Sequence, residues 1–62
     1  MKRAWLKKKR ESRGLTQKDL AISVGVTRQH IGMLESNRSN PSPAIAKRIA
    51  EKLEFDWVKF YD

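Results

Sequence analysis

The sequence predicts an all-α fold in which five short helices pack into one small domain. Apolar residues recur at four-residue steps, most clearly at Ile45, Ile49 and Leu53, and no stretch shows the pattern of a strand. Single glycines and the loop-forming stretch SNRSNPSP divide the chain into short periodic segments. A chain of 62 residues can bury one small core at most, so we expect a single domain over residues 1–62.

The first two helices are expected over about residues 3–13 and 16–24. Gly14 closes the first helix, whose thin apolar face consists of Ala4, Trp5 and Leu6. The second helix opens at Thr16, whose hydroxyl can accept a hydrogen bond from the backbone amide of Asp19 in a weak capping box. The apolar face of this second helix consists of Leu20, Ala21 and Val24.

A tight corner separates the second helix from a third, expected over about residues 28–36. Gly25 can adopt the left-handed conformation that ends a helix, and Thr27 is well placed to cap the next one. The third helix has only Ile31 and Leu34 as an inward pair. Its outward face consists of Arg28, Gln29, Gly32 and Met33.

A loop and two further helices follow the third helix. In the loop, Asn37 is suited to a positive φ, and Ser42 is a cap residue followed by a first-turn proline. The fourth helix, about residues 43–53, is amphipathic, and Asp56 can cap a fifth over about residues 56–61. We expect Trp57, Phe60 and Tyr61 to cover the small core, with a dimer contact as the alternative.

The charge balance favours nucleic acid as the partner. Fourteen Lys and Arg against seven Asp and Glu give a net charge of +7 and a pI near 10.3, which favours salt-dependent binding to a polyanion. The run KKKR at residues 7–10 either contacts phosphate through one of Lys7, Lys8 or Arg10 or acts only through long-range attraction. The lack of Cys and of any apolar stretch of signal-peptide or membrane-spanning length indicates a cytoplasmic location.

Catalytic chemistry has few candidate residues in this chain. His30 is the single histidine, and a Ser or Thr nucleophile would need it as a base oriented by a carboxylate. Asp19 and Glu35 are the nearest acids in the sequence, and neither is well placed for that role. One imidazole is too few for a metal site, and the isolated glycines do not form a phosphate-binding loop. We therefore expect no enzymatic activity, no metal, no cofactor and no small-molecule ligand.

The second and third helices together suggest a way to bind DNA. Two short helices joined at a glycine, the second carrying long polar side chains, suit a helix-turn-helix whose second helix enters the major groove. The side chains of Arg28 and Gln29 match the paired edges of guanine and adenine, respectively. Met33 lies one turn after Gln29, where it either presses on a thymine methyl group or is simply exposed. His30 is expected at a phosphate or on the free surface rather than at a base.

In these residues the chain resembles the Cro/repressor-like helix-turn-helix family, or xenobiotic-response-element (XRE) family, of bacterial and phage transcriptional regulators. The stretches LTQKDLA, VGVTRQHI, LESNRSNPS and AKRIAEKL follow one another at the spacings of that family, over about residues 6–60. The resemblance implies a lambda-repressor-like fold. It also implies base-facing roles for Arg28, Gln29 and Met33, backbone-holding roles for Gln17 and Thr27, and phosphate contacts from Asn37, Arg38 and Asn40. Arg10 and Glu35 match a pair that, in many relatives, bridges the first helix to the end of the third.

Three positions depart from the family pattern. Lys9 replaces a usual apolar residue, so either the first helix packs more loosely or Trp5 supplies the missing apolar area. Gly32 lies in the middle of the recognition helix, at a cost of roughly 1 kcal/mol relative to Ala, and would allow a closer approach to DNA. Asn37 stands where relatives often have Gly, and it can hold the same conformation at some strain.

The sequence therefore predicts a regulator of transcription, in the role of a repressor, that binds an operator in double-stranded DNA. One recognition helix covers few base pairs, so we expect a homodimer that contacts two half-sites about 34 Å apart, or a multiple of that distance. Its copies would pair through the domain's own surface or only on the DNA. The alternative is a protein-interaction module of the antitoxin or antirepressor type that uses the same fold and its aromatic C-terminal end. RNA binding is disfavoured, because no strand pattern or aromatic cluster is suited to stacking unpaired bases.

Overall fold

A computed structural model describes residues 3–61, which form four α-helices and one 3-10 helix. The elements are α1 (Ala4–Ser12), α2 (Gln17–Val24), α3 (Arg28–Glu35), α4 (Pro43–Leu53) and the 3-10 helix η1 (Trp57–Tyr61). The predicted domain also includes Met1, Lys2 and Asp62, which lie outside the described residues. The all-α fold class is correct over residues 3–61, where no strand occurs.

The prediction of five α-helices is wrong for the last element. The amide of Lys59 donates to the carbonyl of Asp56, three residues earlier, at 3.0 Å, which is the spacing of a 3-10 helix. The carboxylate of Asp56 accepts from the amide of Val58 at 3.1 Å, so Asp56 does cap this turn. Five residues are too few for a stable α-helix, and 3-10 geometry is common in such short pieces.

The boundaries of α2 follow from the capping residues found in the sequence. At the start of α2, Thr16 Oγ1 accepts from the amide of Asp19 at 3.0 Å, and the Asp19 carboxylate accepts from the amide of Thr16 at 2.9 Å. This reciprocal pair is the expected capping box. At the other end, Gly25 has φ +77°, and the Val26 amide donates to the Ala21 carbonyl at 3.0 Å. The left-handed glycine thus ends α2 and turns the chain toward α3.

The residues that end α3 and that begin and end α4 show which helix boundaries can be read from the sequence. After α3, Asn37 has the expected positive φ, +63°, and the Arg38 amide reaches back to the Met33 carbonyl at 2.9 Å. At the start of α4, Ser42 Oγ accepts from the amide of Ile45 at 3.3 Å, as its cap position predicts. Glu54, which ends α4 at φ +59°, had no such signal in the sequence.

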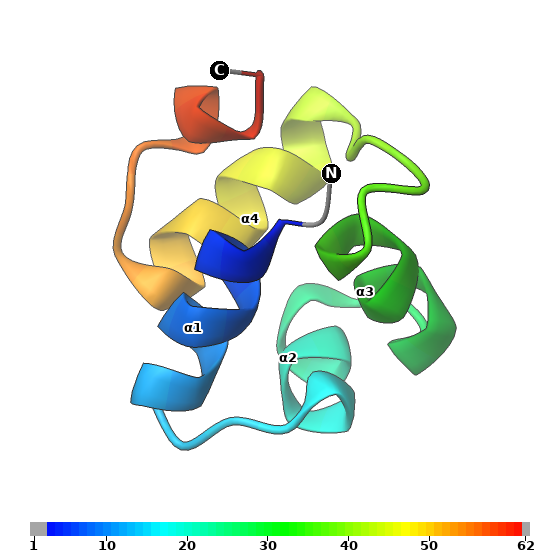
Figure 1. The fold of residues 1–62 in the computed structure, drawn as a ribbon, viewed down its shortest axis with the longest axis vertical. Helices are drawn as coiled ribbons and strands as arrows, with labels where there is room; N and C mark the ends of the chain where they lie inside the picture. Colours follow the sequence, from blue (N-terminus) through cyan, green and yellow to red (C-terminus); the bar gives the residue numbers. More distant parts are fainter. Residues whose placement is uncertain (1–2, 62) are drawn as a thin grey trace.

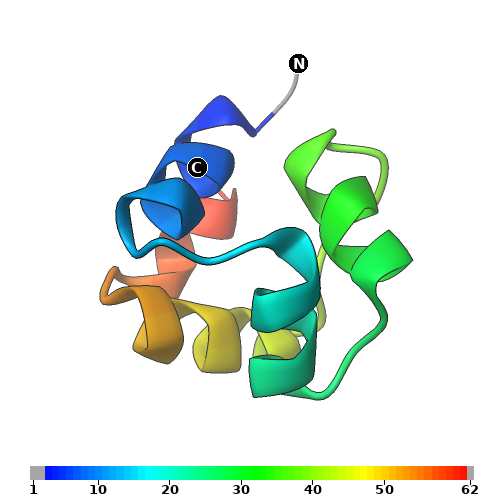
Figure 2. The same cartoon turned by 90° about the horizontal axis from the view of Figure 1, so that it is seen from below.

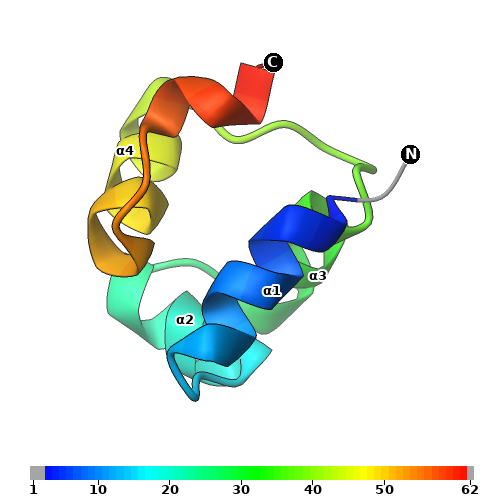
Figure 3. The ribbon, with the colours of Figure 1, turned by 60° about the vertical axis from the view of Figure 1, so that its left-hand side comes forward.

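The helices surround one apolar core. Figures 1 and 2 show α2 and α3 as neighbours around a tight turn, and Figure 3 shows α1 crossing in front of α3. The element η1 packs on α4, near the described start of the chain (Figure 1). The buried core residues are Leu6, Leu20, Ala21, Val24, Ile31, Leu34, Ala46, Ile49, Leu53 and Phe60. No helix in residues 3–61 is long and apolar enough to cross a membrane.

Aromatic packing completes the core beside α1. The Trp5 ring lies edge-on to Phe55 and Phe60, with centroids 5.2 and 5.3 Å away, so Trp5 supplies the apolar area that Lys9 does not. Lys9 places its ammonium 5.7 Å from the centroid of Phe55. Ala4 was expected on the apolar face of α1, but it is exposed, because α1 buries Leu6 together with a charged residue one turn later.

Candidate nucleic-acid interface

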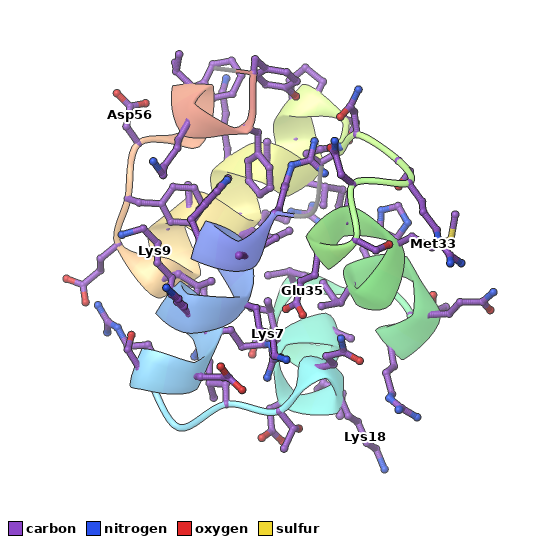
Figure 4. All side chains as sticks on the ribbon, in the orientation of Figure 1. Lys7, Lys9, Lys18, Met33, Glu35 and Asp56 are labelled. Atoms are coloured by element: carbon purple, nitrogen blue, oxygen red, sulfur yellow. The ribbon has the colours of Figure 1, made fainter. Side chains whose placement is uncertain are left out.

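Helix α3 divides its side chains between the core and the surface. Ile31 and Leu34 are buried, as the expected inward pair, and Arg28 and Gln29 are exposed. Figure 4 shows Met33 directed outward from α3, on the other side of the molecule from Lys9 and Asp56. The outer surface of α3 is thus open to a large ligand.

One open hollow on this surface brings together residues from three parts of the chain. It is lined by Gln17, Arg28, Gln29, Gly32, Met33, Ser36 and Arg38. Gln17 comes from the first turn of α2, and Arg38 comes from the loop that follows α3. Residues chosen from the sequence for base contact and for backbone contact therefore meet at one site, and Ser36 is an addition to them.

Gln17 and Thr27 each take part in a hydrogen bond of the fold and keep a polar hydrogen for another acceptor. The Nε2 atom of Gln17 donates to Glu35 Oε1 at 3.1 Å, and an amide nitrogen carries a second N–H for another acceptor. Thr27 caps α3, with its Oγ1 accepting from the amide of His30 at 3.1 Å. A hydroxyl that accepts in this way still has its own proton to donate. Both side chains can therefore contribute to the fold and donate to a phosphate oxygen.

A buried ion pair lies beside Gln17, one of the residues that line the hollow. Arg10 Nε donates to Glu35 Oε2 at 2.6 Å, its Nη2 lies 3.3 Å from Oε1, and its Nη1 donates to the Leu15 carbonyl at 2.7 Å. The hydrogen bond to Glu35 raises the pKa of the Arg10 guanidinium from its ordinary value, against the opposing effect of burial. Since both carboxylate oxygens of Glu35 are engaged by α1 and α2, the pair joins α1, α2 and α3. The buried negative charge is neutralised where an anionic ligand would approach.

The loop after α3, residues 36–42, carries the other predicted phosphate contacts. Asn37 and Arg38 are exposed beside the hollow. Asn40 is also exposed, but its Oδ1 accepts a hydrogen bond from Arg3, which leaves the amide nitrogen of Asn40 to donate elsewhere. The loop thus presents two amides and a guanidinium.

Besides Ser36, Arg3 is a residue near this site that sequence reasoning missed. Its side chain is buried, at 6% exposure, and contacts α3 and the loop, 31 and more residues away in the sequence. Burial lowers the pKa of its guanidinium, an effect that the nearby Tyr61 opposes. No local pattern identifies such a partner, and the only signal is that the last carbonyls of any helix need donors.

Of the remaining candidates, Lys7 lies beside this surface, whereas His30 lines neither hollow. Lys7 borders a second hollow together with Gln17, Gly32 and Ser36, on the side of the surface formed by α1. His30 is half-buried on α3. Residues 3–61 contain no group of three His, Asp or Glu side chains placed to hold a metal ion.

Comparison with known proteins identifies the family. A family model described as "Helix-turn-helix" matches residues 6–60. The chain belongs to the helix-turn-helix family. Two curated relatives bear the description uncharacterized HTH-type transcriptional regulator. YqaF of Bacillus subtilis is 40% identical over 62 residues, which is 100% of this chain and 82% of YqaF. The protein of Methanothermobacter thermautotrophicus is 49% identical over 51 residues, which is 82% of this chain and 74% of that relative.

A solved structure agrees with the fold of this helix-turn-helix chain. Bacillus thuringiensis PlcR, crystallised in complex with the peptide PapR7 and DNA, matches 94% of the chain with a TM-score of 0.83 and 36% identity. This chain spans only 20% of the PlcR chain. The resemblance stated from the sequence is confirmed: the family is one of DNA-binding transcriptional regulators and not one of enzymes.

Proposed function

We propose that this helix-turn-helix chain binds an operator in double-stranded DNA, with α3 in the major groove, and represses transcription. One observation carries the proposal: Arg28, Gln29 and Met33 share an open surface of α3 that also includes Gln17 and Arg38. The major groove is about 12 Å wide and admits one α-helix, so side chains on the outer face of α3 would reach base edges. The DNA in the PlcR structure supports this choice of partner.

Three side chains on α3 would distinguish bases. Arg28 would donate to the O6 and N7 atoms of guanine, and Gln29 would pair with N6 and N7 of adenine. Met33 would press on a thymine methyl group one helical turn farther along. At Gly32 the helix has no side chain, so its backbone could approach the bases more closely there.

Contacts to the sugar–phosphate backbone would hold α3 in its register. Thr27 and Gln17 would donate to phosphates beside the recognition helix, while Asn37, Arg38 and Asn40 would do so from the loop. The net charge of +7 supports this role, because neutralising phosphates releases counterions and makes affinity fall steeply with added salt.

Repression would need only occupancy of the operator, which binding by this domain can achieve in the cytoplasm. Two copies would bind two half-sites as a homodimer. The protein-interaction alternative is less well supported, because Phe60 is buried in the core and Trp57 is packed against it. Tyr61 was expected to cover the core as well, but it is 48% exposed and instead donates to the Pro41 carbonyl, so folding uses only part of the aromatic segment.

The first prediction separates base contacts from phosphate contacts by comparing Gln29→Ala with Arg38→Ala. We expect Gln29→Ala to weaken binding to the preferred duplex by about 1 to 3 kcal/mol and to relax the preference at one base position. We expect Arg38→Ala to weaken binding to all duplexes alike and to reduce the salt slope by about 1. Selection from randomised duplexes, followed by gel shifts at several salt concentrations, measures both effects. An unchanged base preference in Gln29→Ala would reject the role of Gln29.

A further inference from the structure

Arg3 joins the end of the recognition helix to the loop that follows it. Its backbone N–H donates to the Glu35 carbonyl at 2.7 Å, and its Nη1 donates to the Leu34 carbonyl at 2.7 Å. The same Nη1 lies 2.9 Å from the carbonyl of Ser39, and Nη2 donates to Asn40 Oδ1. One arginine thus satisfies two carbonyls in the last turn of α3 and two oxygens of the loop.

The other side of the Arg3 guanidinium rests on the core. Its central carbon lies 5.5 Å from the centroid of the Phe60 ring, which is itself buried. A second tie holds the same loop, because the hydroxyl of Tyr61 donates to the Pro41 carbonyl at 2.8 Å. The loop is therefore fixed against the core through residues from both ends of the described chain.

The residues fixed in this way border the ones proposed to hold phosphates. Arg38 lies between Leu34 and Ser39, whose carbonyls both accept from Arg3, and Asn40 accepts from Arg3 directly. A loop of 36–42 without these bonds would leave carbonyls unpaired and would sample more conformations, at an entropic cost on binding DNA.

We propose that Arg3 is a positioning residue for DNA binding, which holds the loop after α3 so that Arg38 and Asn40 face the phosphates. This inference rests on the proposed function. Arginine suits the task because its planar fork of donors can reach several oxygens at once, whereas a lysine ammonium is a single charged point. Arg3 itself is buried and would act through the loop, without contact to DNA.

The test is a double-mutant cycle between Arg3 and Arg38. We expect Arg3→Gln to weaken duplex binding about tenfold, as for the loss of one charge-assisted hydrogen bond, with base preference retained. If Arg3 acts by placing Arg38 and Asn40, then Arg3→Gln should have a smaller effect in the Arg38→Ala background, because only the Asn40 contact is then left to lose. The salt slope of Arg3→Gln should fall by about 0.9 for each phosphate that the variant no longer neutralises.

Arg13→Gln is the matched control, because it removes the same charge from an exposed arginine that directly follows α1 and pairs with Glu54. Its effect should be small and should multiply with that of Arg38→Ala. Circular dichroism would set a temperature at which each variant is folded. If Arg3→Gln does not fold, Arg3→Lys takes its place in the cycle, since it keeps the charge and the backbone bond to Glu35. We expect a smaller loss of affinity for Arg3→Lys, which again should not multiply fully with that of Arg38→Ala.

Two failures would look different. If the effects of Arg3 and Arg38 substitutions multiply fully, or if Arg3→Gln or its Arg3→Lys substitute binds like the unaltered protein, the positioning role is overturned while operator binding stands. If the unaltered protein shows no salt-dependent preference for any duplex, the proposed function fails and the role of Arg3 fails with it.

Discussion

At the level of single residues, two glycines near the corner have opposite reasons to be glycine. Gly25 has φ +77°, a conformation that costs other residues roughly 1–2 kcal/mol, so the turn itself requires it. Gly32 lies inside α3, and a Cβ added there would lie 3.8 Å from Nε2 of Gln17, an ordinary contact. The fold therefore does not require a glycine at position 32, which agrees with the proposal that the α3 backbone approaches DNA closely there.

The prediction for Gly32→Ala is greater stability and weaker DNA binding. Alanine favours a helix over glycine by about 1 kcal/mol, so the free energy of unfolding should rise by about 0.5–1 kcal/mol. The added methyl group would hold the α3 backbone away from the bases, so affinity for the preferred duplex should fall. Urea denaturation and gel shifts measure the two effects. Gly25→Ala is the control and should lower stability by about 1–2 kcal/mol. Unchanged affinity of Gly32→Ala would show that position 32 does not approach DNA.

At the level of elements, the capping box of α2 predicts a dependence on pH. The hydrogen bond from the Thr16 amide is the largest cause that holds the pKa of Asp19 below its ordinary value. The folded protein thus favours the ionised carboxylate, which stabilises the fold above the unfolded pKa of about 4. That stabilisation is lost as pH falls through the lower pKa of the folded state. Asp19→Asn should therefore be less stable than the unaltered protein at neutral pH and should approach it below about pH 4. Thermal melting at several pH values measures this, and a constant difference down to acid pH would refute it.

The elements also show how far local sequence signals reach. Thr16, Thr27 and Ser42 cap three helices as predicted, because each cap involves atoms only three residues apart. The last element was predicted at the right place but with the wrong helix type, because neither its apolar residues nor its Asp56 cap distinguish a short 3-10 helix from a short α-helix. Glu54 in the left-handed region was not predicted, because glutamate carries no preference for it.

The residues of the candidate site also divide into those that local patterns predict and those that only the packed fold reveals. The outward position of Arg28 and Gln29 follows from the helical period and the inward pair Ile31 and Leu34. The contacts below and behind that surface could not be predicted in this way. The hydrogen bond of Gln17 to Glu35 and the ties of Arg3 to the loop join residues that meet only when the helices pack.

At the level of the whole molecule, size bears on how two copies would share an operator. The Cα trace of the described residues extends 24 Å along its longest axis and 20 Å along the others. Recognition helices placed in successive major grooves on one side of the duplex lie about 34 Å apart. If the long axes lie along the DNA, about 10 Å remains between the two Cα traces, close to the spacing of packed helices. Neighbouring copies would therefore be near enough for side-chain contact.

The last prediction is that binding to two half-sites depends on the helical phase between them. With centres about 10.5 base pairs apart, two copies lie on one side of the duplex and should bind cooperatively. With about 15 base pairs, they lie on opposite sides, cannot touch, and should bind independently as on a single half-site. Quantitative gel shifts on the single, in-phase and out-of-phase duplexes, with half-sites taken from the selection experiment, give the affinity per half-site. Equal affinity per half-site on all three duplexes would mean that the chain binds as a monomer. Sedimentation without DNA then distinguishes the two kinds of dimer. A dimer that forms in free solution appears as the protein concentration is raised, whereas a dimer that assembles only on the operator does not.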